Sequence, residues 1–251
     1  MRSSRRRCGG VGTLRMMGAT VPGPHHLQQG QPNQDCWGGY GMRRGHVLVV
    51  CDGVGSCPRS RQGSRAACRA AREVMRDASD EVTAASFRDR LVERWLEMVR
   101  PGIPSACATT CLVAARWRSG RLLVGGIGDG LAAVVRGGLE ARVEIVDGGR
   151  GEFGETAALC GRGEEQWWTM RDFDDSRGQH RVLLATDGVA NDLVLERLPS
   201  LVNWLVERHG ADGRRRWRSR MRGMLGRWPT PGSSDDRTLA VMWTMTEGAH
   251  G

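Results

Sequence analysis

Val47-Leu-Val-Val-Cys-Asp-Gly-Val-Gly55 is the stretch of sequence from which the fold can be worked out. Its apolar, β-branched residues predict a strand buried on both faces, and its glycines permit a sharp turn directly afterwards. Asp52 would therefore stand at the end of a rigid strand. The same pattern, an apolar strand followed by an acid beside glycine, returns in Arg181–Gly188 and, more weakly, in Leu122–Gly130 and Ser233–Trp243. The sequence thus predicts that several strands each deliver an aspartate.

The composition is typical of a globular protein with a substantial core. The chain has 251 residues, of which 39% are hydrophobic and 26% charged, enough for one large domain or two small ones. The net charge is +9 and all 37 basic residues are arginine, concentrated at the start and in Arg214–Arg222. Such charge can attract nucleic acid, a membrane surface or an acidic protein. Because no aromatic platform or nucleic-acid motif accompanies it, we interpret it as solvated surface and expect no nucleic-acid partner.

Cysteine usage and the apolar runs indicate the compartment. None of the eight cysteines forms a Cys-x-x-Cys pair, which favours free thiols in a reducing cytosol over zinc sites or disulfides. The arginines at the start are not followed by the apolar run of a signal peptide, and no run is long enough to cross a bilayer. We therefore expect a cytoplasmic protein without a membrane partner, and a monomer.

Hydrophobic periodicity predicts eight strands and four helices. The expected strands are Leu14–Val21, His46–Cys51, Ala108–Trp117, Arg121–Ile127, Leu131–Arg136, Leu139–Val146, Val182–Ala185 and Thr238–Thr244. The expected helices are Ser64–Asp80, Phe87–Val99 (capped by Ser86), Leu195–His209 and Trp217–Trp228.

The segments between these elements complete the expected organisation. Gly38–Gly45 is expected to be a turn, and residues 147–180 a long loop or flap with room for one strand. A single domain would span residues 13–246, between a disordered basic segment (1–12) and a short tail (247–251).

The order of elements predicts an α+β fold. Strands between residues 108 and 146 are joined by tight turns, which indicates an antiparallel meander and disfavours a doubly wound parallel sheet. Two helices precede this group and two follow it. Two mainly antiparallel sheets flanked by helix pairs, an α-β-β-α sandwich, would satisfy this inventory.

Acids at strand ends or in loops are the candidate functional residues. They are Asp35, Asp52, Asp129, Asp187 and either Asp235 or Asp236. Each one alone is typical of a turn. Several carboxylates meeting at one sheet edge would repel one another unless a cation neutralised them, and oxygen ligands without His or Cys favour Mg²⁺ or Mn²⁺. Two such ions about 3.5–4 Å apart activate water and clamp a phosphoryl oxygen, so the residues indicate a metal-assisted phosphate hydrolase.

From about Leu14 to Trp243, the order of motifs resembles the metal-dependent protein phosphatases of the PP2C (PPM) type, in particular a compact, atypical bacterial subgroup. The matching motifs are Gln34-Asp35, Asp52-Gly53-Val54-Gly55, Ala108-Thr109-Thr110, Gly128-Asp129-Gly130, Thr186-Asp187-Gly188 and Asp235-Asp236-Arg237-Thr238. Each motif alone is weak, whereas the complete series in order is specific.

The resemblance implies a centre of two Mn²⁺ or Mg²⁺ ions, with a third possible. Asp52 would bridge two ions and Gly53 would offer its carbonyl to one of them. Asp187 and Asp235 would complete the shell of the first ion. A water bound to this centre would attack the phosphorus of phosphoserine or phosphothreonine. The partners implied are phosphorylated protein substrates, with a Ser/Thr kinase or its targets.

Further residues take roles that the resemblance implies around this centre. Asp35 would position the bound waters and be catalytic together with Asp52, Asp187 and Asp235. Gln34 would hold the second ion through water, and Asp129 would hold the third ion.

The sequence departs from the family pattern at three positions. Gln34 replaces a glutamate, which should weaken the second ion site and demand high Mn²⁺. Gly30 stands where many relatives have the arginine that grips the substrate phosphate. Val54 replaces a histidine that acts as general acid in some relatives. The candidates for the missing phosphate contact are His26, Arg43 and Arg59. A catalytically weak pseudo-phosphatase that acts as a binding module is the alternative.

Overall fold

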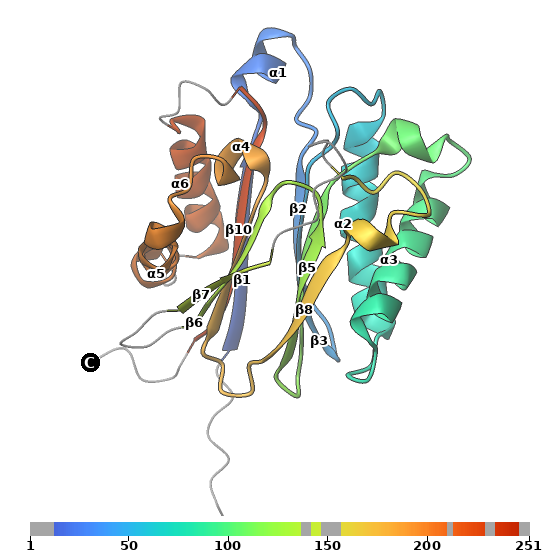
Figure 1. The fold of residues 1–251 in the computed structure, drawn as a ribbon. Coiled ribbons are helices and arrows are strands. Elements are labelled where there is room, and N and C mark those ends of the chain that lie inside the picture. The colour runs from blue at the N-terminus through green and yellow to red at the C-terminus, as the bar shows by residue number, and fades with distance from the viewer. Residues whose placement is uncertain (1–12, 137–141, 147–156, 210–212, 229–233, 246–251) are drawn as a thin grey trace, which may run out of the picture.

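Two antiparallel five-stranded sheets lie face to face in the computed structural model, with helices on both outer faces (Figure 1). The structure describes residues 13–136, 142–146, 157–209, 213–228 and 234–245. The first sheet contains, in spatial order, β1 (Thr13–Val21), β10 (Arg237–Met245), β9 (His180–Ala185), β6 (Leu131–Arg136) and β7 (Arg142–Ile145). The second contains β2 (Cys36–Gly41), β3 (Gly45–Cys51), β4 (Cys111–Trp117), β5 (Arg121–Ile127) and β8 (Thr169–Asp174). The predicted α-β-β-α sandwich is confirmed.

The helices form one pair on each outer face. α2 (Ser60–Asp77) and α3 (Ala84–Val99) cover the second sheet, and α5 (Leu198–His209) and α6 (Arg214–Gly226) cover the first. The shorter helices are α1 (Pro24–Gln28) and α4 (Asp187–Ala190), with 3-10 turns at Pro104–Cys107, Glu165–Trp167 and Leu195–Arg197. The α3 helix begins earlier than predicted, because Thr83 rather than Ser86 is its N-cap and accepts a hydrogen bond from the Ser86 backbone N–H.

β3 shows why the opening stretch lacks the alternation of a surface strand. Val47, Val49 and Cys51 pack under α2 and α3, whereas Leu48 and Val50 point into the layer between the two sheets. All five side chains are fully buried. A strand covered on both faces reads as a continuous apolar run, as the sequence predicted.

β2 occupies the first half of the segment for which a turn was predicted, Gly38–Gly45. Its glycines serve the packing of large rings: a Cβ atom on Gly38 would lie 2.5 Å from the Tyr40 ring. A Cβ atom on Gly18 of the facing strand β1 would likewise lie 2.5 Å from the Trp37 ring. The predicted turn is confined to residues 42–44, which join β2 to β3. It was predicted too long because glycine in a strand can also mark a close approach.

The predicted meander between residues 108 and 146 is also wrong. β4 and β5 pair as a hairpin in the second sheet, but β6 pairs with β7 and β9 in the first. The chain therefore changes sheets at Gly128–Gly130, and Gly128 takes a positive φ of 118° there. Asp129 therefore lies in the connection from the end of β5 in one sheet to the start of β6 in the other, and not in a hairpin turn.

Several predicted segments lie wholly or partly outside the described residues. These are the basic start (1–12), the tail (247–251), the beginning of the expected strand at 139–146 and the first part of the expected flap, 147–156. The rest of that flap carries β8, which pairs with β5. The seven cysteines that the structure describes are free thiols. In the described part of the chain, no helix combines the length and the hydropathy that crossing a bilayer requires.

Candidate metal centre

Three elements bring aspartates to one end of the sandwich. Asp52 follows β3, Asp187 is the first residue of α4 after β9, and Asp235 precedes β10. β9 and β10 are neighbours in the first sheet, and β3 faces them from the second. One carboxylate oxygen from each aspartate lies within 4.8 Å of those of the other two. The structure therefore brings together three acids that are 135 and 48 residues apart in the chain.

Asp35 lies directly beside this triad and joins the two sheets. It precedes β2 and is 6% exposed. Its Oδ2 accepts hydrogen bonds from the hydroxyls of Thr186 (2.9 Å) and Thr238 (2.6 Å), which belong to the ends of the strands on the opposite sheet. These two bonds fix the orientation of the carboxylate, whose Oδ1 is buried and accepts no hydrogen bond from the residues that the structure describes.

The acids at this end perturb one another's ionisation. Burial raises the pKa of Asp35 to about 7. Burial also raises the pKa of Asp52 well above its usual range, and the charges of Asp35 and Asp187 raise it further. The pKa of Asp187 is raised by burial and then by the charges of Asp129 and Asp235. The cluster thus concentrates negative charge that a proton or a cation has to neutralise.

Asp235 and Asp236, which the sequence could not separate, have different surroundings. Asp235 is exposed and faces Asp52 and Asp187. Asp236 is 1% exposed and accepts hydrogen bonds from the backbone N–H groups of Gly23 (2.8 Å) and Gln34 (2.6 Å). Asp236 therefore ties the loop before β2 to the loop before β10, and Asp235 is the acid of the triad.

Gln34 is held at the edge of the cluster by its backbone. Its N–H donates to Asp236, and its carbonyl accepts a hydrogen bond of 2.5 Å from Ser64 of α2. Its side-chain Oε1 is buried and accepts no hydrogen bond from the described residues. Gly53 lies against it, because a Cβ atom on Gly53 would be 3.1 Å from the Gln34 Cβ and 2.9 Å from Ser60.

Two threonines of the segment before β4 form hydrogen bonds with the backbone of Asp52. The Asp52 carbonyl accepts hydrogen bonds from the Thr109 hydroxyl and the Thr110 N–H, both at 2.7 Å. The Asp52 N–H in turn donates to the Thr110 hydroxyl at 3.0 Å. Asp129 lies close enough to Asp187 for its charge to raise the pKa of that carboxyl.

The candidates for gripping a substrate phosphate differ in their position. His26 is 6% exposed, and its Nδ1 lies 2.9 Å from Asp236 Oδ1. Its ring therefore contacts the residue that ties the loop before β2 to the loop before β10. Arg59 is exposed and donates to Gln62 at 3.0 Å. Arg43 lies in the turn before β3, at the opposite end of that strand from Asp52. Roughly 20 Å of strand separates the two, and Arg43 is too distant to serve the site.

Comparison with known proteins identifies the chain. The sequence profile of the family described as protein phosphatase 2C matches residues 22–226, which include most of the cluster. The chain belongs to the protein phosphatase 2C family. None of the curated proteins matches the sequence itself at a significant level.

Solved phosphatases share the fold of this phosphatase 2C chain. A bacterial serine phosphatase, solved as a point mutant, is 15% identical, with a TM-score of 0.65 and coverage of 93% of this chain and 100% of that one. The catalytic domain of PstP, solved with two manganese ions, is 19% identical, with a TM-score of 0.65 and coverage of 92% and 98%. MsPP from Mycobacterium smegmatis, solved with cacodylate, is 19% identical, with a TM-score of 0.63 and coverage of 92% and 98%.

The phosphatase 2C site contains supporting residues that the sequence analysis did not single out. Thr186 and Thr238 orient Asp35, and Asp236 was considered only as an alternative ligand. Threonines near two of the predicted acids were the available signal, since Thr186 precedes Asp187 and Thr238 lies three residues after Asp235. Nothing in the sequence indicated which acid these hydroxyls would contact.

Proposed function

We propose that this phosphatase 2C protein hydrolyses phosphoserine and phosphothreonine in proteins with the help of Mn²⁺ or Mg²⁺. The observation that carries the proposal is the convergence of Asp52, Asp187 and Asp235, with one oxygen of each within 4.8 Å of the others. The two manganese ions in the PstP structure, a similar fold, support the choice of cation.

The residues at the site fit a hard divalent cation. The donor set consists of oxygens, which Mg²⁺ and Mn²⁺ prefer. Asp35 Oδ1, Asp187 Oδ1 and Gln34 Oε1 are buried and accept no hydrogen bond from the described residues. Buried oxygens without partners are costly, and a cation with its waters would satisfy them.

Each residue has a definable task in the proposed centre. Asp52, Asp187 and Asp235 would hold the first ion, and Asp52 with the Gly53 carbonyl would extend the site to a second. When bound, such ions lower the pKa of water and neutralise charge on the phosphoryl oxygens. Asp35, fixed by Thr186 and Thr238, would orient the attacking water through its free Oδ1.

Gln34 and Asp129 would contribute to the second and third ion sites of the proposed centre. The Gln34 amide oxygen can accept a hydrogen bond from water but carries no charge, so the second ion should bind weakly. Asp129, at the crossing between the sheets, would hold a third ion beside Asp187. We keep Arg59 as the candidate contact for the substrate phosphate. The burial of His26 favours a positioning role for that residue.

The uncharged Gln34 also favours a second candidate function. In a pseudo-phosphatase, the same fold would bind phosphoproteins or regulate a partner without turnover. The triad of carboxylates supports the enzyme over this alternative, because a binding module has no need to concentrate buried negative charge.

A metal titration of phosphopeptide hydrolysis tests the proposal. We expect the purified protein to release phosphate from phosphoserine and phosphothreonine peptides in the presence of millimolar Mn²⁺, and far less from phosphotyrosine peptides. Asp52→Asn should abolish the activity. Binding of phosphopeptides without hydrolysis at any Mn²⁺ or Mg²⁺ concentration would instead establish the pseudo-phosphatase.

A further inference from the structure

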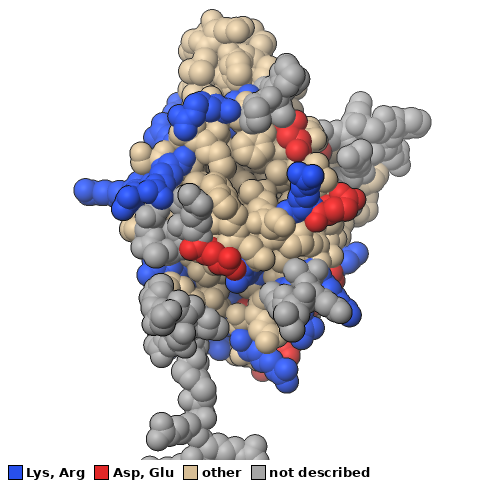
Figure 2. All heavy atoms as spheres, turned by 90° about the vertical axis from the view of Figure 1, so that its left-hand side faces the viewer, with Lys and Arg blue, Asp and Glu red and all other residues tan. Residues whose placement is uncertain are grey.

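The α6 helix carries a concentration of positive charge that the proposed phosphatase site does not use. It contains six arginines and no acidic residue: Arg214, Arg215, Arg216, Arg218, Arg220 and Arg222. All six side chains are exposed. Figure 2 views the side of the molecule that carries α5 and α6 and shows a group of basic side chains on one margin, apart from the acidic ones. Exposed arginine is therefore the main feature of this helix face.

The positions of these arginines destabilise the α6 helix. Arg214, Arg218 and Arg222 succeed one another at intervals of four residues, so like charges are neighbours on one face. Arg214 and Arg215 also lie in the first turn, where the helix dipole disfavours cations. Within the part of the chain that the structure describes, no acidic side chain forms an ion pair with Arg214, Arg215, Arg218 or Arg222.

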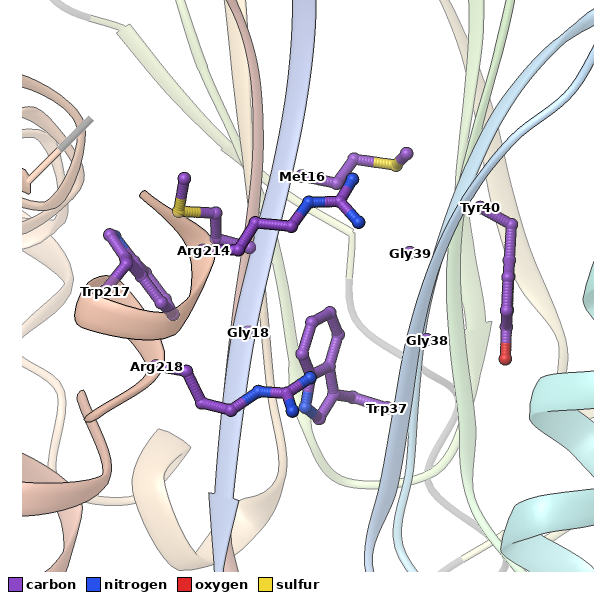
Figure 3. A pocket seen from close by; sticks show the side chains of 10 residues that line it. Met16, Gly18, Trp37, Gly38, Gly39, Tyr40, Arg214, Trp217 and Arg218 are labelled. Atoms are coloured by element: carbon purple, nitrogen blue, oxygen red, sulfur yellow. The ribbon is translucent and has the colours of Figure 1, made fainter. Parts of the chain in front are cut away.

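A cavity lies beside this helix, between the edge strands of the two sheets. Its volume is about 250 Å³, and its lining combines β1, β2 and α6. Figure 3 shows the side chains of Arg214 and Arg218 extending from α6 towards β2, with the guanidinium group of Arg214 near Met16 of β1 and that of Arg218 at the Trp37 ring of β2. An open depression lined by Arg214, Arg215, Arg218, Ser219 and Arg222 continues from it along the helix.

Trp37 positions one of these arginines. One face of its ring lies against the backbone of Gly18, where a Cβ atom would be 2.5 Å from the ring. The guanidinium carbon of Arg218 lies over the ring at 5.9 Å from its centroid. Such a contact orders the guanidinium and leaves its N–H groups available for an anion.

We propose that this groove, formed by Arg214, Arg218, Arg222 and Trp37, binds an acidic segment of a partner protein in an extended conformation. The argument rests on charge complementarity and on spacing. Successive arginines four residues apart on the helix are about 6 Å apart along its axis. Alternate residues of an extended chain are separated by about 6.6 Å, so acids at every second position would match the three arginines.

The contacts of Trp37 favour a peptide over nucleic acid. Single-stranded nucleic acids bind by stacking their bases on free aromatic faces. The Trp37 ring lies against Gly18, and the Arg218 guanidinium lies over it at 5.9 Å from its centroid, so the ring is not a free platform for a base. What the groove offers is guanidinium groups for carboxylates rather than a platform for bases.

Fluorescence anisotropy with labelled peptides tests the proposal. One probe has glutamate at every second position, alternating with threonine, and a second has the same composition with the glutamates consecutive. We expect the alternating peptide to bind more tightly, and the double variant Arg214→Gln/Arg218→Gln to lose about tenfold or more of that affinity. Glutamine retains helix propensity, and Arg214→Lys/Arg218→Lys, which keeps the charge but not the planar guanidinium, should lose less affinity than the glutamine variant.

The matched control is Arg61→Gln/Arg65→Gln, which removes two exposed arginines at the same spacing from α2. We expect less than a twofold change in this variant. Equal losses in the two double variants would overturn the proposal in favour of non-specific attraction. It would also be overturned if the two peptides bound equally, if neither bound, or if a single-stranded oligonucleotide bound more tightly than both.

Discussion

The carboxylate of Asp236 accepts a hydrogen bond of 2.6 Å from the backbone N–H of Gln34, which precedes it by 202 residues. The other carboxylate oxygen accepts from Gly23 at 2.8 Å. Through these bonds, the loop that carries Gln34 and Asp35 is attached to the segment that carries Asp235. The position of the proposed centre therefore depends on a residue outside the triad of Asp52, Asp187 and Asp235.

We expect Asp236→Asn to destabilise the protein by about 1–3 kcal/mol, because the amide presents only one acceptor oxygen and a buried N–H loses its partner. Urea unfolding in the absence of metal measures this. Asp235→Asn is the matched control: its side chain is exposed, and Asn can still accept from the Asp236 N–H, so we expect a change below about 0.5 kcal/mol. Equal destabilisation by both variants would show that Asp236 is no tether.

Asp52→Asn should separate stability from activity. Burial and the charges of Asp35 and Asp187 raise the pKa of Asp52, so the metal-free protein should become more stable at pH 8 when this charge is removed. Phosphatase activity with Mn²⁺ should fall by about 100-fold or more. Unfolding curves with a chelator and initial rates on a phosphothreonine peptide provide the two measurements. A variant that is less stable or fully active would contradict the assignment.

Stability of the metal-free protein should fall as pH rises from about 4 to 7 and beyond. Carboxyls ionise near pH ~4 in the unfolded chain, whereas Asp35 has a pKa of about 7 in the folded protein, and the pKa values of Asp52 and Asp187 are also raised. The folded state thus binds more protons across this window, which makes its stability decrease with pH.

Calorimetry at pH 5 and pH 8, with a chelator and with Mn²⁺, measures this dependence. Mn²⁺ should restore stability at pH 8, because the ion binds the ionised cluster of the folded protein. A metal-free melting temperature that is constant or higher at pH 8 would be incompatible with this description of the acids.

Gln34→Glu should strengthen the second ion site. The added charge would lie where the buried Oε1 of Gln34 accepts no hydrogen bond within the described part of the chain, and we expect half-maximal activity at roughly tenfold lower Mn²⁺. Gln31→Glu places the same charge on an exposed side chain of the same loop and should leave the requirement nearly unchanged. If both variants shift the Mn²⁺ dependence alike, the effect is long-range attraction and Gln34 has no special role.

Local signals in the sequence predicted the layers and most helices and strands, but they could not assign strands to sheets. The meander was predicted because β4, β5 and β6 are joined by short glycine-containing turns. β6 nevertheless pairs with β9, about fifty residues further along, because both faces of β6 are then covered. Pairing partners depend on packing between distant segments, which periodicity does not record.

The sequence led us to expect that distant acids meet, and the structure brings Asp52, Asp187 and Asp235 together. The different surroundings of neighbouring acids required coordinates. Asp235 and Asp236 are chemically identical neighbours, and only the geometry shows one facing the triad and the other holding Gly23 and Gln34. Likewise, the sequence indicated no aromatic platform for the arginines of α6, because Trp37 is some 180 residues away and adjacent only in the fold, whereas Trp217 of the same helix is buried.

The position of β10 between β1 and β9 has a consequence for the synthesis of the protein. During synthesis, β1 and β9 leave the ribosome before β10, which lies between them in the sheet. The sheet therefore cannot be completed until residues 237–245 have been made. Asp235 arrives at the same moment. We therefore expect that translation yields no ion-binding intermediate, and that premature termination before residue 237 leaves an aggregation-prone fragment with two open strand edges.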